Sequence, residues 1–270
     1  MRGIFRKIIR EVWVGTLLFG IAFLLVEILL NLILPLLLEQ LGDMLDRLPF
    51  IRDFLGALLG VDVEGEISAQ IMQAFVWVHP VVLTLLWAQE IFFCTRFPVG
   101  EIDRGTIDVL LGLPVSRRKV YLCETIGWLT SGLIILSFGA VGYLIGSRGM
   151  EVEARPEFGF ILLVLLNLFC VYIAVGGVAY LVSSLCDRRS RAVSIVFSLV
   201  LGSFLINFLA RFWPPAEPFA FLSVLDYYPP AQVLKSGAIP MGDVAALLAM
   251  GTVSWIIGGE IIARRNICTT

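Results

Sequence analysis

The sequence is short of charge. Only 16% of its 270 residues are Asp, Glu, Lys or Arg, and 59% are hydrophobic, whereas soluble domains carry about 25% charged and about 45–50% apolar residues. This composition excludes an ordinary soluble domain and is typical of a chain that resides in a lipid bilayer. The net charge of −2 is uninformative by itself, because acidic and basic residues are concentrated in different parts of the chain, and nucleic-acid binding is not expected.

Other residue types are also scarce. His79 is the only histidine, and the six methionines are scattered, so the chain is predicted to hold no metal. The five cysteines show neither a disulfide framework nor the spacing of metal ligands. A G-x-x-x-x-G-K-[ST] loop, which would cradle nucleotide phosphates, is absent. The chain is therefore predicted not to be an enzyme that hydrolyses ATP.

Apolar runs make up most of what is present. About 20 apolar residues in a helix cross the roughly 30 Å core of a bilayer, where no water satisfies backbone groups. We therefore expect an all-α integral membrane protein that forms one transmembrane domain over residues 1–270. Six spans are predicted, near residues 14–38, 71–95, 119–146, 158–184, 192–211 and 243–263.

Basic residues predict the orientation, because Lys and Arg favour the cytoplasmic side of a membrane. With the N-terminus inside, 14 of the 20 basic residues fall on cytoplasmic gaps and 6 on external ones. Both termini are therefore expected in the cytoplasm. Basic and apolar residues alternate between Arg2 and Trp13, a pattern typical of a helix lying in the membrane interface.

The gap between spans two and three is longer than a hairpin requires. Wound at 100° per residue, Ile102, Thr106, Val109, Leu110 and Leu113 gather on one side, and Glu101, Arg104, Gly105, Asp108 and Gly112 gather on the other. This predicts a short amphipathic surface helix, which either lies on lipid headgroups or inserts into a second protein. Asp103 or Thr106 is expected to cap its start, Pro114 to end it, and Ser116 to cap the next span.

The same segment resembles the membrane subunits of type 2 ATP-binding-cassette (ABC) transporters. The residues that carry the resemblance are Glu101, Gly105, Thr106, Leu110, Leu111, Pro114, Val115, Ser116 and Arg117. The basic N-terminal helix, the six spans, the long external gap before the last span and the basic C-terminal end extend the resemblance over the whole chain.

The resemblance implies that ATP hydrolysis and transport belong to different subunits. The segment would be a coupling helix that docks on a separate cytoplasmic ATPase, which uses ATP and Mg²⁺, while this chain holds no cofactor of its own. The residues assigned to this coupling role are Glu101, Asp103, Arg104, Gly105, Thr106, Asp108, Leu110, Leu111, Pro114, Ser116 and Arg117. The expected assembly is a permease in the plasma membrane that pairs with a second permease and exports its substrate.

Several polar residues lie inside the apolar runs, where a charge costs roughly 2.5–3.5 kcal/mol. The candidates for a translocation path are Glu27, Asn31, His79, Glu90, Asn167 and Asn207. For any single one of them, the preferred interpretation is that it pairs with another polar group or lies close enough to the membrane interface to stay hydrated. Glu27, Glu90 and Glu260 also suit a transporter or channel driven by an ion gradient.

Two of the gaps expected outside the cell also have informative residue patterns. Apolar positions between residues 39 and 60 predict an amphipathic helix on the outer leaflet, broken near Pro49. The gap from Phe212 to Asp243 contains aromatic residues and prolines, which suit short re-entrant pieces. A third interpretation of the chain is a membrane relay that passes ATPase motion to an external partner through residues 39–60.

Overall fold

The computed structural model describes residues 2–47, 69–112, 114–150 and 155–265. No strand occurs in these ranges. The helices are α1 (Arg2–Arg47), α3 (Ala69–Val78), α4 (Pro80–Cys94), α5 (Val99–Asp103), α6 (Ile107–Leu111), α7 (Arg117–Gly146), η1 (Ser147–Gly149), α8 (Phe158–Leu185), α9 (Arg189–Phe212), η3 (Pro214–Leu222), η4 (Val224–Tyr227), α10 (Pro230–Ser236) and α11 (Met241–Arg264). The prediction of an all-α protein is confirmed.

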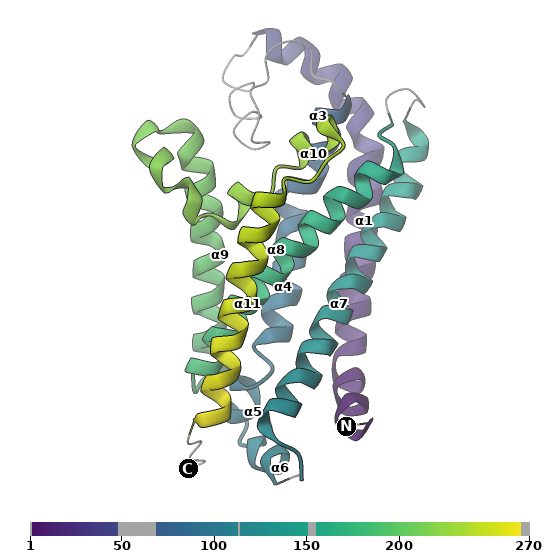
Figure 1. The fold of residues 1–270 in the computed structure, drawn as a ribbon. Helices are drawn as coiled ribbons and strands as arrows, with labels where there is room; N and C mark the ends of the chain where they lie inside the picture. The colour runs from purple at the N-terminus through teal and green to yellow at the C-terminus, as the bar shows by residue number, and fades with distance from the viewer. Residues whose placement is uncertain (1, 48–68, 113, 151–154, 266–270) are drawn as a thin grey trace.

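Six helical stretches in the described part are long and apolar enough to cross a membrane. They are Phe5–Leu36, Gln73–Cys94, Arg117–Gly149, Phe158–Leu185, Arg189–Arg211 and Met241–Arg264. Each coincides with a predicted span, although the first begins earlier than expected. Figure 1 shows these helices side by side as one bundle, with both chain termini, α5 and α6 at the same end.

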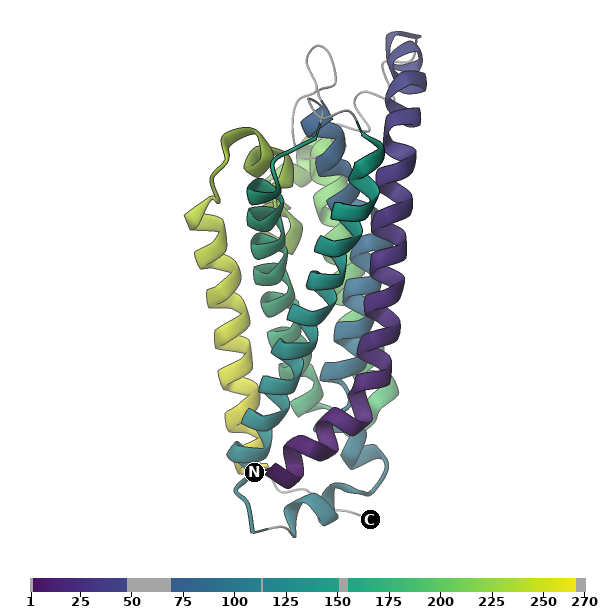
Figure 2. The ribbon, with the colours of Figure 1, turned by 90° about the vertical axis from the view of Figure 1, so that its right-hand side faces the viewer.

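The N-terminal basic stretch is the first part of α1 and not a separate helix. Figure 2 shows that the first turns of α1 bend away from the axis of the rest of the helix. At its other end α1 continues to Arg47, so residues 39–47 extend the first span where a separate outer helix was expected. The expected break near Pro49 lies outside the described residues.

The second span is interrupted at the single histidine. Pro80 occupies the first turn of α4, where its missing N–H is not needed. The His79 side chain accepts a hydrogen bond from the Val81 N–H (3.3 Å) through Nδ1. His79 therefore caps α4, which is a structural role.

Close packing holds the bundle together. Among the described elements, α1 with α7 and α8 with α11 are the most extensively packed pairs. Glycines allow both contacts: a Cβ on Gly142 would lie 2.8 Å from the Leu24 carbonyl oxygen of α1, and one on Gly177 would lie 2.1 Å from the Gly251 carbonyl oxygen of α11. Small residues therefore bring these backbones together within one chain.

The gap after α9 folds into η3, η4 and α10 at the end opposite the termini (Figure 1). Trp213, Phe219 and Phe221 are exposed there, whereas Tyr228 is buried. The short pieces expected here are present as short helices, and their re-entrant placement in the membrane stays a prediction.

Candidate functional site

The segment between α4 and α7 forms two short helices, so the expectation of one surface helix was wrong. Helix α5 ends at Asp103, and Gly105 then adopts the left-handed conformation with φ of 68°. The Gly105 N–H donates to the Ile102 carbonyl, and the Thr106 N–H donates to the Glu101 carbonyl, each at 3.0 Å. This pair of bonds is a helix-ending motif that glycine favours. Helix α6 begins two residues later.

The break changes which side chains face water. Glu101, expected on the exposed side, is buried, and Val109, expected on the apolar side, is 74% exposed. Ile107 is instead the apolar residue of α6 that is buried. A single 100° period across Gly105 fails because α5 ends before this glycine and α6 begins after it. The side chains of Leu110, Leu111 and Leu113 lie outside the described part.

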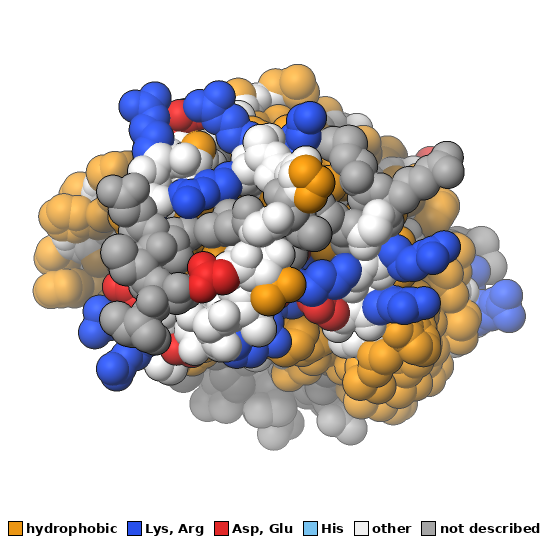
Figure 3. Space-filling view, turned by 90° about the horizontal axis from the view of Figure 1, so that it is seen from below, with side chains coloured by type: hydrophobic (Ala, Val, Ile, Leu, Met, Phe, Trp, Pro, Cys, Tyr) orange, Lys and Arg blue, Asp and Glu red, His pale blue; other side chains and the backbone are white. Residues whose placement is uncertain are grey.

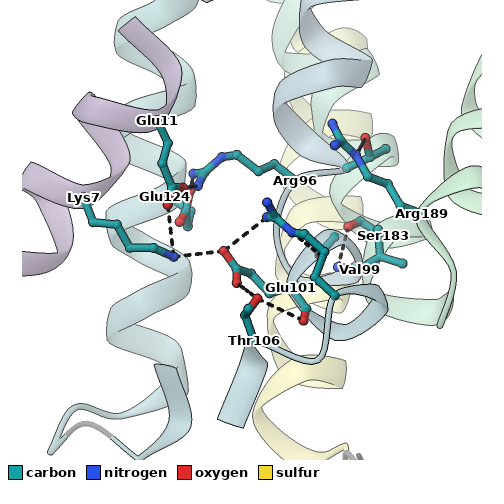
Figure 4. A network of polar contacts seen from close by, with 12 residues as sticks. Lys7, Glu11, Arg96, Val99, Glu101, Thr106, Glu124, Ser183 and Arg189 are labelled. Atoms are coloured by element: carbon teal, nitrogen blue, oxygen red, sulfur yellow. Dashed lines mark hydrogen bonds and ion pairs between the residues drawn. The ribbon is translucent and has the colours of Figure 1, made fainter. Parts of the chain in front are cut away.

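Glu101 is the centre of a polar network, drawn in Figure 4. Its carboxylate accepts hydrogen bonds from the Lys7 ammonium of α1 (2.9 Å) and from the Thr106 hydroxyl, and it lies 3.5 Å from the Arg104 guanidinium. Burial raises the pKa of Glu101, but these hydrogen bonds and the charges of Lys7 and Arg104 outweigh it, so the pKa lies below its ordinary value. The carboxylate therefore stays ionised and joins α5 to α1.

The lowered pKa of Glu101 predicts how the stability of the protein depends on pH. Glu101→Gln is expected to reduce the free energy of unfolding by about 1 kcal/mol near pH 7, because hydrogen bonds to a charged group are lost and solvent at Lys7 screens part of the effect. The folded pKa lies below the unfolded value of about 4.3, so the wild-type advantage is complete above that value and is lost as pH falls through the folded pKa. Thermal unfolding of both proteins in detergent from pH 7 to pH 3 measures this.

Glu217→Gln provides the control, because Glu217 is an exposed carboxylate at the opposite end of the bundle. It is expected to change stability by less than about 0.5 kcal/mol at every pH. A difference between wild type and Glu101→Gln that grows in acid would contradict the ionised state of Glu101.

Arg96 forms a second ion-pair cluster beside the first. Its guanidinium pairs with Glu11 of α1 and with Glu124 of α7, and it lies over the Phe93 ring (5.5 Å). The side chain of Arg96 is 6% exposed and that of Glu124 is 4% exposed. From the sequence, Arg96 was only one of the 14 basic residues expected on the cytoplasmic side, and its role in an ion-pair cluster was not predicted. The signal that was missed is Glu124, an acidic residue inside the third span.

The segment is also tied to α9. The Asp103 carboxylate accepts a hydrogen bond from the Arg189 N–H (3.3 Å), so Asp103 caps the start of α9, whereas it was expected to cap the surface helix. The Arg189 guanidinium donates to the Phe92 carbonyl (3.1 Å) and to the Thr95 hydroxyl (3.4 Å). Thr106 was the alternative cap, and its hydroxyl instead donates to Glu101.

The expected start of the next span is confirmed. Ser116 is the N-cap of α7 and accepts a hydrogen bond from the Lys119 N–H (3.4 Å). Arg117 donates to the carbonyls of Ile262 (3.3 Å) and Arg265, at the end of α11. Helix α6 ends at Leu111, before Pro114. The α4–α7 segment thus has polar contacts with α1 and α9, and the first residue of α7 has polar contacts with the end of α11.

The end face of the bundle at α5 and α6 carries many basic side chains. Figure 3 shows Lys and Arg around most of this face, with few acidic side chains between them. Both termini and the α4–α7 segment lie at this end. The basic face therefore coincides with the end that the charge count predicts to be cytoplasmic.

The family model described as ABC-2 family transporter protein matches residues 5–257. The chain belongs to the ABC-2 transporter family. A comparison with curated proteins finds no match. The resemblance seen in the sequence is therefore confirmed, and the chain is a membrane subunit of the ABC transporter class.

The ABC-2 bundle does not assemble the six predicted path residues into one site. Glu27 and Asn31 lie on adjacent turns of α1, where the Asn31 amide donates to the Glu27 carbonyl oxygen (2.7 Å) and accepts from Gln73 (3.0 Å). The Asn31 amide also donates to the Glu27 carboxyl group (3.4 Å), so pairing, the preferred interpretation, describes these two side chains. His79 caps α4, and no described hydrogen bond links it to the other five.

Three further path residues have different environments. Glu90 and Asn167 are completely buried, and no hydrogen-bond partner with good geometry lies beside their side-chain polar atoms in the described part of the chain. A Cβ on Gly176 would lie 2.5 Å from Glu90 Oε1, so glycine at that position allows α8 to pass close to the carboxyl group. Asn207 is half-buried. Their place on a translocation path stays a prediction.

Proposed function

We propose that this chain is the permease subunit of an ABC exporter. It would work in the plasma membrane with both termini in the cytoplasm, as a homodimer or with a second permease, and with a separate ATPase subunit. The ATPase would supply the energy, because the chain has no phosphate-binding loop. Membership of the ABC-2 family supports the transporter class.

The observation that carries the proposal is the way the α4–α7 segment is held. Its inner side is anchored by Glu101 to α1 and by Asp103 to α9. Its outer side presents exposed residues, among them Arg104 and the apolar Val109. A surface that is fixed to several helices and exposes an apolar side chain suits docking of a second protein, whose movement would then reach those helices directly.

The direct test is to disrupt that surface and measure assembly. Replacing residues 104–113 by Gly and Ser, or changing Val109→Asp alone, is expected to reduce co-purification of the co-expressed ATPase at least about tenfold, because a central apolar contact carries much of the binding energy of an interface. Pull-down from detergent extracts, with and without nucleotide, measures the bound fraction.

Met241→Asp is the matched control. Met241 is 75% exposed, close to the 74% of Val109, and lies at the opposite end of the bundle. It is expected to leave co-purification unchanged. An intact complex that still responds to nucleotide after replacement of residues 104–113 would refute the docking role.

An ion-gradient mechanism remains the competing function, because Glu27 and Glu90 are buried inside spans. It requires transport into or out of sealed vesicles in the absence of ATP and of the ATPase subunit. Transport that depends on both would eliminate it.

A further inference from the structure

An open groove runs along the part of α11 nearest the termini. It has a volume of about 660 Å³ and lies between α11 and the end of α8. Leu185, Ile256 and Ile257 line it, and these residues are 59%, 51% and 46% exposed. Ile261 also lines the groove, so four of its eight lining residues are apolar.

Arginines lie at one end of the groove. Arg264 and Arg265 line it together with Glu260. Glu260 is already neutralised, because its carboxylate pairs with Arg118 (2.9 Å) and with Arg264 (3.3 Å). Arg265 pairs with Asp187. Three arginines therefore face two carboxylates, and the side chain of Arg264 is 80% exposed. The end of the groove retains positive charge.

The length of α11 places this charge at the membrane surface. Helix α11 has 24 residues, and at 1.5 Å per residue it is about 36 Å long, slightly more than the roughly 30 Å hydrocarbon core. Arg264, its last residue, thus lies at the level of the lipid headgroups. Leu185, the last residue of α8, lies beside the arginines, because Arg265 donates to the carbonyls of Ser184 and Cys186 on either side of it. Ile256 and Ile257 lie about two turns deeper along α11, at the level of the acyl chains.

We propose that this groove binds an anionic phospholipid of the adjacent leaflet. The phosphate would lie against Arg264, and one acyl chain would follow Leu185, Ile256 and Ile257. Basic pockets between membrane helices recognise anionic headgroups in this way. The match of a charged end to an apolar trough favours a lipid over a second copy of the chain. The proposal requires that α8 and α11 span a membrane and does not depend on the coupling role of α5 and α6.

Native mass spectrometry of the purified full chain tests the site. The probes are dioleoylphosphatidylglycerol and dioleoylphosphatidylcholine, titrated into delipidated protein in detergent. Phosphatidylglycerol is expected to bind more tightly, and Arg264→Gln is expected to weaken its binding about fivefold, since one basic residue near the surface contributes about 1 kcal/mol. Arg118 remains to pair with Glu260 in this variant.

Three variants separate the contributions. Arg264→Lys keeps the charge and is expected to retain the preference for phosphatidylglycerol. Ile257→Ser shortens the apolar trough and is expected to weaken both lipids alike. Arg211→Gln removes a basic residue at the opposite end of the bundle and is expected to change neither affinity.

Several outcomes would overturn the proposal. One is equal binding of the two lipids to the wild type, and another is an equal effect of Arg264→Gln and Arg211→Gln. Competition by soluble glycerol phosphate at the same concentration as the diacyl lipid would assign the site to a free anion. A protein dimer that dissociates in Ile257→Ser would assign the groove to a second copy of the chain.

Discussion

Replacing Arg96 by methionine is expected to lower the free energy of unfolding by about 3 to 5 kcal/mol, the usual cost of breaking a buried ion pair from one side. Arg96 lies between Glu11 and Glu124, and both Arg96 and Glu124 are buried. Methionine fills much of the same space but leaves the Glu124 carboxylate without its partner. Thermal or denaturant unfolding of the purified chain in detergent micelles measures the loss.

Arg118→Met is the matched control at the same end of the bundle. Its ion pair with Glu260 is exposed on both sides, at 63% and 42% of the side chains, so its loss is expected to cost less than about 1 kcal/mol. Adding Glu124→Gln to Arg96→Met is expected to recover about half of the loss, because it removes the uncompensated buried charge. Equal effects of Arg96→Met and Arg118→Met would show that the Arg96 cluster contributes no more than a surface pair.

Gly177→Ala is expected to destabilise the bundle by at least about 3 kcal/mol, at the upper end of the range for overpacking. The added Cβ would lie 2.1 Å from the Gly251 carbonyl oxygen and 2.8 Å from its Cα. These are backbone atoms, which cannot rotate away as a side chain can, so α11 must separate from α8. The unfolding midpoint and the yield of folded protein from membranes measure this.

Gly202→Ala makes the same chemical change on another span. Apart from its own helix backbone and chain neighbours, no atom in the described ranges lies within 4 Å of a Cβ built on Gly202 of α9. The substitution is therefore expected to be neutral or to stabilise the protein by up to about 1 kcal/mol, since alanine is the better helix former. Similar unfolding midpoints for the two alanine variants would contradict the close packing of α8 on α11.

The location of the candidate site was predictable from the sequence, but its internal geometry was not. A segment that is less apolar than its neighbours, between two long apolar runs, is a local feature, and Ser116 followed by a helical run is a local cap signal. Gly105 was the available signal for the break between α5 and α6, because glycine favours the left-handed end of a helix. It was instead placed within one continuous helix.

Glu101 and Asp103 illustrate what local patterns miss. Periodicity assigned Glu101 to water, yet Lys7, 94 residues earlier, holds it in the interior. Asp103 was expected to cap its own helix, yet it caps α9 through Arg189, 86 residues later. A pattern in one segment contains no information about a partner so distant in the chain.

The sequence by itself determined that the chain has six helices long and apolar enough to cross a membrane, and which family it belongs to. The six helices follow from properties of single segments, since a bilayer requires about 20 apolar residues in a helix whatever the neighbouring helices are. The family follows from the sequence motif between the second and third of these segments. Only the tertiary structure decided that Arg96 joins α1 to α7, that Glu101 is buried, and that Arg264 stands at the end of an apolar groove. Each of these depends on how separate helices pack, and packing is determined by shape and charge across the whole bundle.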